Sequence, residues 1–442
     1  MIDGVGELYA AHVAALSAEY ARCLDAHGFD AVVIHGGVAR KRSEFDDQYW
    51  PLRPTPHFQH WVPLSEPDAA LVIRPGRAPQ LARVPSTSFW EAPLPPESDH
   101  FAPHFEHLTL AEADALRREL PGGRVAFLGE DLAQAARWGI HESCRNPEAL
   151  RGSLDALRTR KSAYERACLA EANRRAAPGH AALREAFFDG PRTELELHLA
   201  YLGATKQDDA ETPYKNIVAL DRNAATLHHI AYARTDGARA RALLLDAGAT
   251  CLGYCSDITR TWVRPEGDAA AERFAALVAE LDAMQRRLCA AVSPGLGYES
   301  LHDRAHEELG AVLARVGLVR CGAEEAVSSG ITRAFLPHGL GHSLGLQCHD
   351  VGCAVVRPRA DNPFLRNTSV IEAGQVFTIE PGVYFIDGLL RPLREGPNAA
   401  RVNWDEVDAL APFGGVRIED DLYVTGDPAR PVENLTRDAL GD

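Results

Sequence analysis

Over the first 155 residues, the hydrophobic positions alternate between helical and strand-like spacing. The opening stretch, MIDGVGELYAAHVAALSAEYARCLDAHGFD, has the spacing of an amphipathic helix, and DAVVIHGG follows as a short apolar run ending in two glycines. Such a run is typical of a buried strand entering a turn. Two more strand-like runs, AALVIRPG and GGRVAFLG, lie around a helical stretch, TLAEADALRREL. This alternation predicts a small α/β domain over residues 1–155.

From residue 156 onward, long helical segments are followed by strand-like segments that come in adjacent pairs. The boundary is marked by Pro147 and Gly152, after which a charged helical run begins at Arg158. The strand-like segments are NIVAL, RALLLDAGA, DITRTWV, QVFTIEPGVYF and GVRIEDDLYV. The helical segments among them are AAAERFAALVAELDAMQRRLCAAV and LHDRAHEELGAVLARVG. Adjacent strands favour an antiparallel sheet, so we expect a larger α+β domain over residues 156–442.

Composition narrows the classes of function. The chain has 442 residues, which is long for one core and agrees with two domains. It carries 46 Lys+Arg against 62 Asp+Glu, and the resulting charge of −16 argues against nucleic acid or an anionic membrane as partner. The nine cysteines include no CxxC pair and predict reduced thiols. With no basic leader and no apolar run near the roughly 20 residues of a membrane span, we expect a cytoplasmic protein.

Three histidines, His338, His342 and His349, lie in the glycine-rich segment PHGLGHSLGLQCHD. Each glycine weakens a helix by about 1 kcal/mol relative to alanine, so an extended or looped path is expected. In a strand, His338 and His342 share a face and His349 has the opposite parity, so the three converge only through a bend. Taken alone, a glycine-rich turn with incidental histidines explains the segment equally well.

Two aspartates lie in LLLDAGATCLGYCSDITRTW. If this segment is a hairpin centred between Cys251 and Leu252, Asp246 and Asp257 face each other directly. Opposed Cβ atoms lie about 4.5–5.5 Å apart, close enough for both carboxylates to hold one cation. Two anions at that distance need a cation or a shared proton. The alternative is that one aspartate caps a turn and the other is solvated.

Two glutamates complete the acidic set. Glu380 ends the strand-like run VFTIEPG, and in GGVRIEDD the period of two places Glu419 on the same face as Arg417. A buried carboxylate without a partner is costly, although Glu419 could simply pair with Arg417. Four carboxylates and an imidazole suit two ions such as Mn²⁺ or Co²⁺ better than a thiolate zinc site, and their charges balance two dications. Two such ions activate water, which indicates metal-assisted hydrolysis.

The order Asp, Asp, His, Glu, Glu resembles the ligand set of the pita-bread metallopeptidases, which include methionine aminopeptidase, aminopeptidase P and prolidase. The likeness is greatest to the bacterial Xaa-Pro dipeptidase and organophosphorus acid anhydrolase branch. It is carried by PYKNIVALDRNAATLHH, DAGATCLGYCSDITRTW, FLPHGLGHSLGLQCHDVG, FLRNTSVIEAGQVFTIEPGVYF and GGVRIEDD, and by FDDQYWPLRPTPHFQHWVPL near the N-terminus. The resemblance implies a creatinase/prolidase-like N-terminal domain before a catalytic domain with a curved, mostly antiparallel sheet.

The resemblance also implies a role for each ligand. Asp246 would bind the first ion and His342 the second, Asp257 and Glu419 would bridge them, and Glu380 would be both a ligand and the general base. The ions implied are two divalent cations, Mn²⁺ foremost, with Co²⁺ or Zn²⁺ as alternatives.

Further residues acquire roles by the same likeness. His228 and His349 would contact the scissile carbonyl and steer proton transfer, and Arg366 would grip the substrate's C-terminal carboxylate. The remaining substrate-binding candidates are His338, Arg417, Tyr214, Leu227 and Tyr298. By likeness to the family's homodimers, Asp46 and Trp90 would reach into the neighbouring subunit's pocket. The chain departs from its relatives at His229, where they carry an aromatic residue, and at Ser343 and Cys348, which affects the width and polarity of the pocket.

The function implied is a dinuclear metal-dependent dipeptidase that hydrolyses Xaa-Pro dipeptides through a hydroxide held between the ions. One alternative is aminopeptidase P-like removal of the first residue from longer Xaa-Pro peptides. Another is organophosphorus acid anhydrolase activity as the main reaction. A non-catalytic binding module is disfavoured, because proteins that use the fold in that way typically lose the ligands and this chain has all five.

Overall fold

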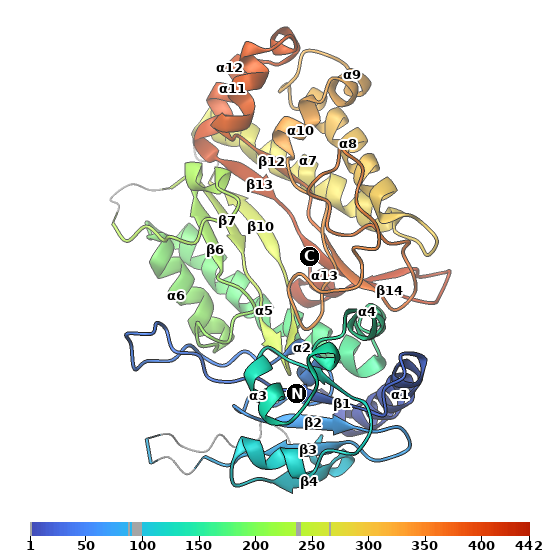
Figure 1. Ribbon diagram of the computed structural model, residues 1–442. Helices are drawn as coiled ribbons and strands as arrows, with labels where there is room; N and C mark the ends of the chain where they lie inside the picture. The colour runs from blue at the N-terminus through green and yellow to red at the C-terminus, as the bar shows by residue number, and fades with distance from the viewer. Residues whose placement is uncertain (1, 87–88, 91–99, 236–239, 265–266) are drawn as a thin grey trace. The chain divides into compact units, whose positions relative to one another are not determined.

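The computed structural model describes residues 2–86, 89–90, 100–235, 240–264 and 267–442 (Figure 1). The chain divides into two compact units, Met1–Ala167 and Cys168–Asp442. The division lies inside helix α5 (Ala163–Asp189) rather than at residue 155. Within the described ranges, none of the helices combines the length and the apolarity needed to cross a membrane.

The first unit is built on a mixed five-stranded sheet in the order β4-β3-β2-β1-β5. Strand β1 is antiparallel to β2 and parallel to β5, and all five of its residues are buried. The strands are β1 (Ala31–His35), β2 (Ala70–Ile73), β3 (Gln80–Arg83), β4 (Glu106–Thr109) and β5 (Val125–Leu128). The helices are α1 (Val5–Ala26), α2 (Pro56–Gln59), α3 (Leu132–Arg137) and α4 (Glu148–Leu157). The three predicted strands are present, but the stretch expected to be a helix forms only the 3₁₀ turn Ala113–Arg118.

In the second unit, one half of the core packs two helices against a three-stranded antiparallel sheet. The sheet consists of β6 (Ile217–Leu220), β7 (Ala242–Asp246) and β10 (Thr259–Val263), and the helices are α5 and α6 (Glu194–Thr205). Leu243 and Leu245 of β7 pack with side chains of both helices. Because side chains alternate along a strand, Leu244 and Asp246 point to the opposite face. Asp246 therefore emerges on the side away from α5 and α6.

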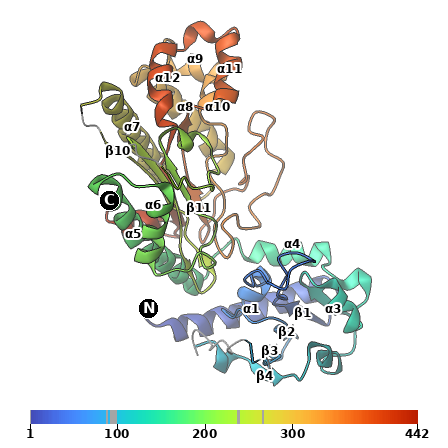
Figure 2. The same cartoon turned by 90° about the vertical axis from the view of Figure 1, so that its left-hand side faces the viewer.

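The other half of this unit surrounds the long helices α7 (Ala269–Ala291) and α8 (Tyr298–Arg315), which lie side by side in Figures 1 and 2. Its strands are β11 (Val376–Ile379), β12 (Gly382–Tyr384), β13 (Gly415–Arg417), β14 (Asp420–Val424) and β15 (Val432–Asn434). The remaining elements are β8 (Thr250–Cys251), β9 (Tyr254–Cys255), α9 (Ala323–Ser328), α10 (Ile331–Phe335), α11 (Asp387–Glu395), α12 (Trp404–Leu410) and α13 (Leu435–Leu440). All strand pairs described in this unit are antiparallel, as the pairing of strands along the chain predicts. A bridge between Thr259 and Glu419 joins the two halves.

The hairpin that carries the two aspartates has a different register from the predicted one. Asp246 pairs with Thr259 rather than with Asp257. The turn is centred one residue later than expected, because Leu252 and Gly253 both have positive φ, 52° and 91°. A two-residue hairpin loop of type I′ needs this conformation at both central positions, and glycine supplies it readily at the second. The predicted direct opposition of the two carboxylates is therefore wrong. Asp257 lies two residues before Thr259, the residue that pairs with Asp246.

Candidate metal centre and substrate cavity

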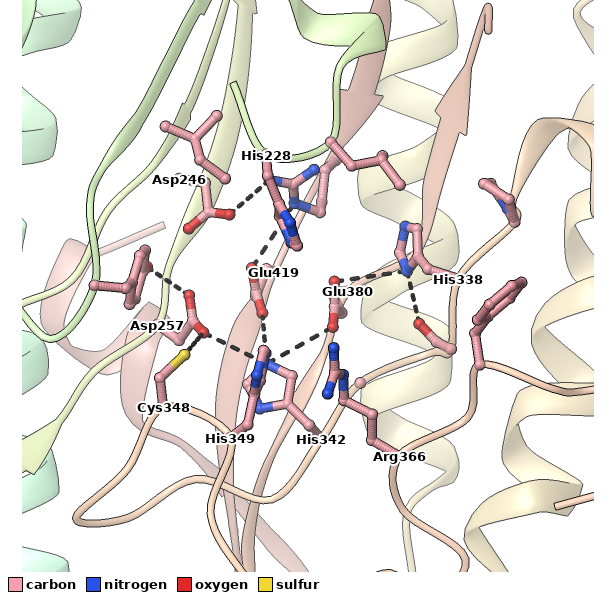
Figure 3. A pocket seen from close by; sticks show the side chains of 18 of the residues that line it. His228, Asp246, Asp257, His338, His342, Cys348, His349, Arg366, Glu380 and Glu419 are labelled. Atoms are coloured by element: carbon pink, nitrogen blue, oxygen red, sulfur yellow. Dashed lines mark hydrogen bonds and ion pairs between the residues drawn. The ribbon is translucent and has the colours of Figure 1, made fainter. Parts of the chain in front are cut away.

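A cavity of about 920 Å³ opens in the second unit (Figure 3). It is lined by every candidate site residue except Tyr298: Tyr214, Leu227, His228, Asp246, Asp257, His338, His342, His349, Arg366, Glu380, Arg417 and Glu419. These side chains come from segments far apart in the chain. The structure therefore gathers the predicted site in one place.

The four carboxylates lie at ends of strands or at junctions between them. Asp246 is the last residue of β7, Asp257 lies between β9 and β10, Glu380 lies between β11 and β12, and Glu419 lies between β13 and β14. The side chains of Asp257 and Glu419 are only 6% and 2% exposed. Strand ends point carboxylates into the cavity while the flanking apolar residues remain in the core, which is why acidic residues occur inside such apolar runs.

The His342 imidazole lies at the centre of this acidic set. Its Nε2 is 3.4 Å from Asp257, 3.8 Å from Glu380 and 3.9 Å from Glu419, while its Nδ1 is 3.1 Å from the carbonyl of Ser343. Because Nδ1 donates to that carbonyl, Nε2 is the atom available to a cation. A side chain at Gly341 would place a Cβ 2.1 Å from the carbonyl of Thr378, so only glycine lets this segment approach β11. The segment follows the expected looped path.

Arg417 has a different partner from the predicted one. Its guanidinium donates to Asp246 at 2.6 Å, whereas its Nε is 4.0 Å from Glu419. The Thr259 hydroxyl lies between the two groups, accepting from Arg417 at 3.2 Å and donating to Glu419 at 2.7 Å. An ion pair with Arg417 therefore does not account for the burial of the Glu419 carboxylate. Arg417 orients Asp246 and supports the wall of the cavity.

The site holds more negative charge than its own cations balance. Burial raises the pKa of Glu380 to about 7 and that of Asp246 to about 6, and burial with the neighbouring carboxylates raises the pKa of Glu419 well above its ordinary value. For Asp257, burial is outweighed by the hydrogen bond and charge of His342, and the pKa is lowered. Burial lowers the pKa of His342, but Asp257 and Glu380 together raise it to about 9.

The donor set fits divalent cations. Oδ1 of Asp246 is buried and accepts no hydrogen bond from the described residues. Asp257, His342 and Glu419 each offer one ligand atom, and these atoms all lie within 4.8 Å of one another. Carboxylate oxygens with one imidazole suit Mn²⁺, Co²⁺ or Zn²⁺, and an orphaned, buried carboxylate oxygen is the feature a cation would satisfy.

His338 lines the cavity, and each of its ring nitrogens forms a hydrogen bond. Its Nδ1 lies 2.7 Å from the carbonyl of Gly339, and its Nε2 lies 2.9 Å from the hydroxyl of Tyr384. Arg417 also donates to that hydroxyl, at 3.1 Å, so the Tyr384 proton goes to Nε2 of His338. The imidazole is thus a neutral Nδ1–H tautomer, and burial together with the charge of Arg417 lowers its pKa to about 3. Tyr384, which the sequence did not single out, links His338 to Arg417.

His228 is exposed at the mouth of the cavity, on a segment held by one buried carboxylate. Glu194, at the start of α6, accepts hydrogen bonds from the backbone of Leu220 at 2.9 Å and of Ala233 at 2.7 Å. It also contacts Nε2 of His229 at 2.8 Å and accepts from Asn223 at 2.8 Å. The unusual His229 therefore points away from the reacting centre and anchors the segment that presents its neighbour. No short motif reveals Glu194, because its partners lie 26 or more positions away.

Two hydrogen bonds from the cavity wall reach Asp257. The Tyr214 hydroxyl donates to Oδ1 at 2.5 Å, and the Cys348 thiol donates to Oδ2 at 2.9 Å. The ring of His349 stands edge-on to that of His342, with centroids 4.4 Å apart. Burial and the charge of His342 lower the pKa of His349 to about 4. The predicted pocket residue Tyr214 is thus also an orienting partner of a candidate ligand.

Tyr298 does not line the cavity. It is fully buried, and its hydroxyl donates to the carbonyl of Thr378 at 2.8 Å, behind the glycine-rich segment. Its assignment to the substrate pocket is wrong, because the first residue of α8 faces the core rather than the cavity. Asp46 and Trp90 belong to the other unit and are not among the residues that line the cavity.

Two family models match the chain. Residues 167–426 match metallopeptidase family M24, and residues 7–156 match the N-terminal domain of Xaa-Pro dipeptidase. The chain is 42% identical to the Xaa-Pro dipeptidase of Marinobacter nauticus over 434 residues, 98% of each protein. It is 40% identical to that of Pseudoalteromonas haloplanktis over 452 residues, covering 100% of both.

Solved structures of Escherichia coli aminopeptidase P have the same fold. The low-pH form superposes with a TM-score of 0.72 at 23% identity, covering 96% of this chain and 95% of that one. The zinc-substituted form in complex with product has a TM-score of 0.70. The expected pita-bread arrangement is confirmed by this likeness.

Proposed function

The chain belongs to metallopeptidase family M24, and we propose that it is a dinuclear-metal dipeptidase that hydrolyses dipeptides with proline in the second position. The observation that carries the proposal is that Arg366 opens into the same cavity as the five candidate ligands. Full-length relatives named Xaa-Pro dipeptidase support the choice of substrate.

The residues that would hold the ions are Asp246, Asp257, His342, Glu380 and Glu419. Two divalent cations bound there would lower the pKa of a water molecule and polarise the scissile carbonyl. We infer Mn²⁺ as the metal because oxygen donors predominate in the set. Arg417 and Tyr214 hold Asp246 and Asp257 in place through short hydrogen bonds.

The chain's own residues bind and orient the substrate. Arg366 is exposed in the cavity and forms no ion pair with any described carboxylate, so its guanidinium is free to bind the carboxylate of a C-terminal proline. His228 and His349 are exposed in the same cavity and donate hydrogen bonds to the oxygen of the scissile carbonyl as it gains charge. Glu380 accepts a proton from the attacking water and passes it to the departing proline nitrogen.

We further infer that the enzyme acts in the cytoplasm as a homodimer. The nine cysteines are all free thiols, which agrees with a reducing compartment. Phe45 and Trp90 of the first unit are 99% and 83% exposed, and large exposed apolar side chains are typical of surfaces that contact another chain. Sedimentation of the purified protein tests this inference, with a dimer expected and a monomer contradicting it.

A panel of peptides tests the function. Mn²⁺-loaded protein is incubated with Ala-Pro, with Ala-Pro-Ala and with longer Xaa-Pro peptides, and free amino acids are measured. We expect proline to be released from Ala-Pro with little cleavage of the longer peptides, since Arg366 needs a carboxylate on the proline itself. Removal of the first residue from longer peptides would show an aminopeptidase P-like enzyme instead. Faster turnover of a phosphofluoridate than of Ala-Pro would show that phosphoester hydrolysis is the main reaction.

A further inference from the structure

One wall of the cavity carries a cysteine beside two histidines whose rings contact each other. We propose that His342, Cys348 and His349 form a second cation site, selective for thiophilic divalent ions such as Zn²⁺ and Cd²⁺, and that filling it inhibits the enzyme. The existence of the site is independent of the peptidase reaction, whereas the inhibition rests on the proposed function.

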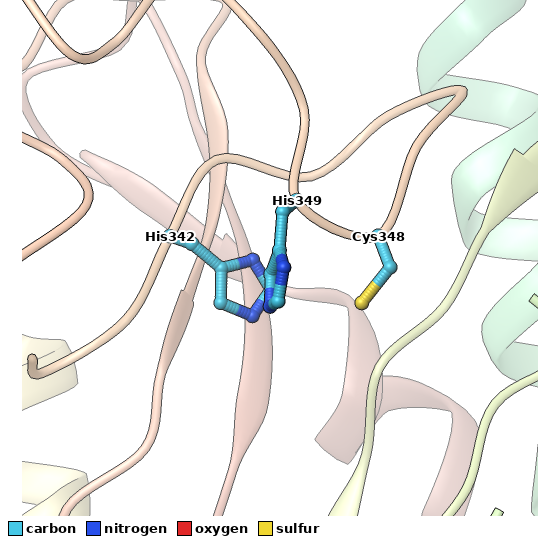
Figure 4. Close-up of side chains that lie close together, drawn as sticks. All are labelled: His342, Cys348 and His349. Atoms are coloured by element: carbon cyan, nitrogen blue, oxygen red, sulfur yellow. The ribbon is translucent and has the colours of Figure 1, made fainter. Parts of the chain in front are cut away.

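The three donors already lie within the span of one cation. One ligand atom from each residue lies within 4.8 Å of the others, and Figure 4 shows the thiol and the two rings facing a common space. The rings of His342 and His349 are held at 81° with centroids 4.4 Å apart. Cys348 is fixed from the other side, because its thiol donates to Asp257 at 2.9 Å.

Two of the three donor residues are at least partly exposed. Of the nine cysteines, seven are buried, and only Cys321 and Cys348 are partly exposed. Cys348 lines the cavity, and Cys321 does not. His349 is exposed, and within the described part of the chain no residue hydrogen-bonds to its ring. Cys348 and His349 thus line the same cavity as the buried carboxylates.

The chemistry of the donors separates two kinds of ion. Thiolate and imidazole are soft and borderline ligands that select Zn²⁺ or Cd²⁺, whereas carboxylates suit the harder Mn²⁺. On binding, the S–H bond of Cys348 breaks, a sulfur–metal bond forms, and the proton is released to solvent. His342 is common to both sets of ligands, so an ion at the thiol competes for this imidazole. It also occupies His349, which contacts the substrate carbonyl in the proposed reaction.

The test uses Cd²⁺ as the probe and Mn²⁺-loaded protein. Wild type, Cys348→Val, Cys348→Ser and the matched control Cys321→Val are titrated with Cd²⁺ while the ultraviolet thiolate-to-cadmium absorption band and the released protons are recorded. We expect one band and one proton per chain in wild type and in Cys321→Val, and neither in the two Cys348 variants. Hydrolysis of Ala-Pro is measured in parallel, relative to each variant's own rate without Cd²⁺. Inhibition by Cd²⁺ should be weakened about 10–100-fold in the Cys348 variants.

The outcomes are distinguishable. A band that persists in the Cys348 variants, or that disappears in Cys321→Val, would overturn the site. Equal inhibition of wild type and the Cys348 variants would overturn the inhibitory role, because Cd²⁺ would then act by replacing Mn²⁺ at the carboxylates. A wild-type band in a protein that does not cleave Ala-Pro would support the cation site and contradict the proposed function.

Discussion

Glu419 and Asp420 are neighbours in the chain, buried to nearly the same degree, yet their charges are balanced in different ways. Asp420 lies 2.8 Å from Arg260 and 2.7 Å from Arg437, and the charges of the two arginines outweigh burial and lower its pKa. Glu419 faces the cavity, where its carboxylate lies 3.9 Å from Nε2 of His342 and 4.0 Å from Nε of Arg417. Its pKa is raised well above the ordinary value by burial and by the neighbouring carboxylates.

The difference separates structural from functional acids. Strand geometry sends adjacent side chains to opposite faces, so one face of this segment is neutralised by the protein and the other is not. A buried charge must be paired, because an unpaired one is costly. Asp420 is paired with two arginines of the fold, whereas the four cavity carboxylates share only Arg417 and His342 among them. The shortage of positive charge in the cavity is thus the physical reason to expect two bound divalent ions.

The largest effect is expected on the cavity side of the comparison. Asp257→Asn removes the charge of a candidate ligand, and we expect kcat for Ala-Pro to fall about 10³-fold or more, since metal ions contribute several kcal/mol to such reactions. The thermal unfolding midpoint of the metal-free variant should also fall below that of metal-free wild type, because His342 loses the charge of Asp257, 3.4 Å away. A wild-type rate in this variant would contradict the role of Asp257.

Asp420→Asn tests the carboxylate that is paired with arginines of the fold. This change removes a buried carboxylate that Arg260 and Arg437 share, while Arg260 keeps Asp442 and Arg437 keeps Asp282, so the loss of charged hydrogen bonds should cost about 1.5–3 kcal/mol. We expect a large loss of unfolding free energy in denaturant titration, with kcat per folded molecule close to that of wild type. A loss of activity without a loss of stability would show that Asp420 takes part in function. The distinction between Asp420 and the cavity carboxylates would then not hold.

The stabilisation of the folded protein by Mn²⁺ should depend on pH, because the cavity carboxylates bind protons that Asp420 does not. The pKa values of Asp246 and Glu380 are raised to about 6 and about 7, so the folded metal-free protein binds more protons than the unfolded chain between their ordinary pKa values and pH 7. Its stability therefore falls as pH rises through this window. Cations bind the deprotonated carboxylates, so the increase in unfolding temperature caused by Mn²⁺ should be larger at pH 8 than at pH 5.5. An increase that is larger at pH 5.5 would contradict the assignment.

Tyr214→Phe removes the hydroxyl that contacts Asp257 and leaves the ring in place. Residues that orient a metal ligand typically contribute 10–100-fold to metal affinity or activity, and we expect a decrease of about that size in kcat or in Mn²⁺ affinity. Equilibrium dialysis measures the Mn²⁺ affinity, and initial rates at saturating Mn²⁺ measure kcat. Unchanged values for both would show that the hydroxyl does not orient the ligand.

The smallest effect is expected for His229→Ala. Glu194 keeps its contacts to Leu220, Asn223 and Ala233, so the segment that presents His228 loses only one of its anchors. We expect kcat to fall about tenfold or less, equivalent to ~1.4 kcal/mol. Glu194→Ala, which removes all the anchors at once, should reduce activity further. Equal effects of the two changes would contradict this account of the segment.

The sequence was a better guide to which residues gather in the cavity than to their geometry. Asp246, Asp257, His342, Glu380 and Glu419 were identifiable because acidic residues stood out within apolar strands and occurred in a known order. The register of the hairpin was missed, because it depends on positive φ at two turn residues that alternation alone does not reveal. Residues with distant partners, such as Tyr384 and Glu194, were not found because their partners lie in other segments. Tyr298 was misplaced because a helix start gives no information on which face reaches the cavity.

The most direct test of the central claim is the number of divalent ions that the chain binds. Metal-free protein is reconstituted with Mn²⁺, excess ion is removed, and bound manganese is measured together with the release of proline from Ala-Pro. We expect two ions per chain and activity that appears only as they bind. A protein that binds no divalent ion, or that hydrolyses Ala-Pro at the full rate without one, would contradict the claim that the cavity carboxylates exist to hold cations.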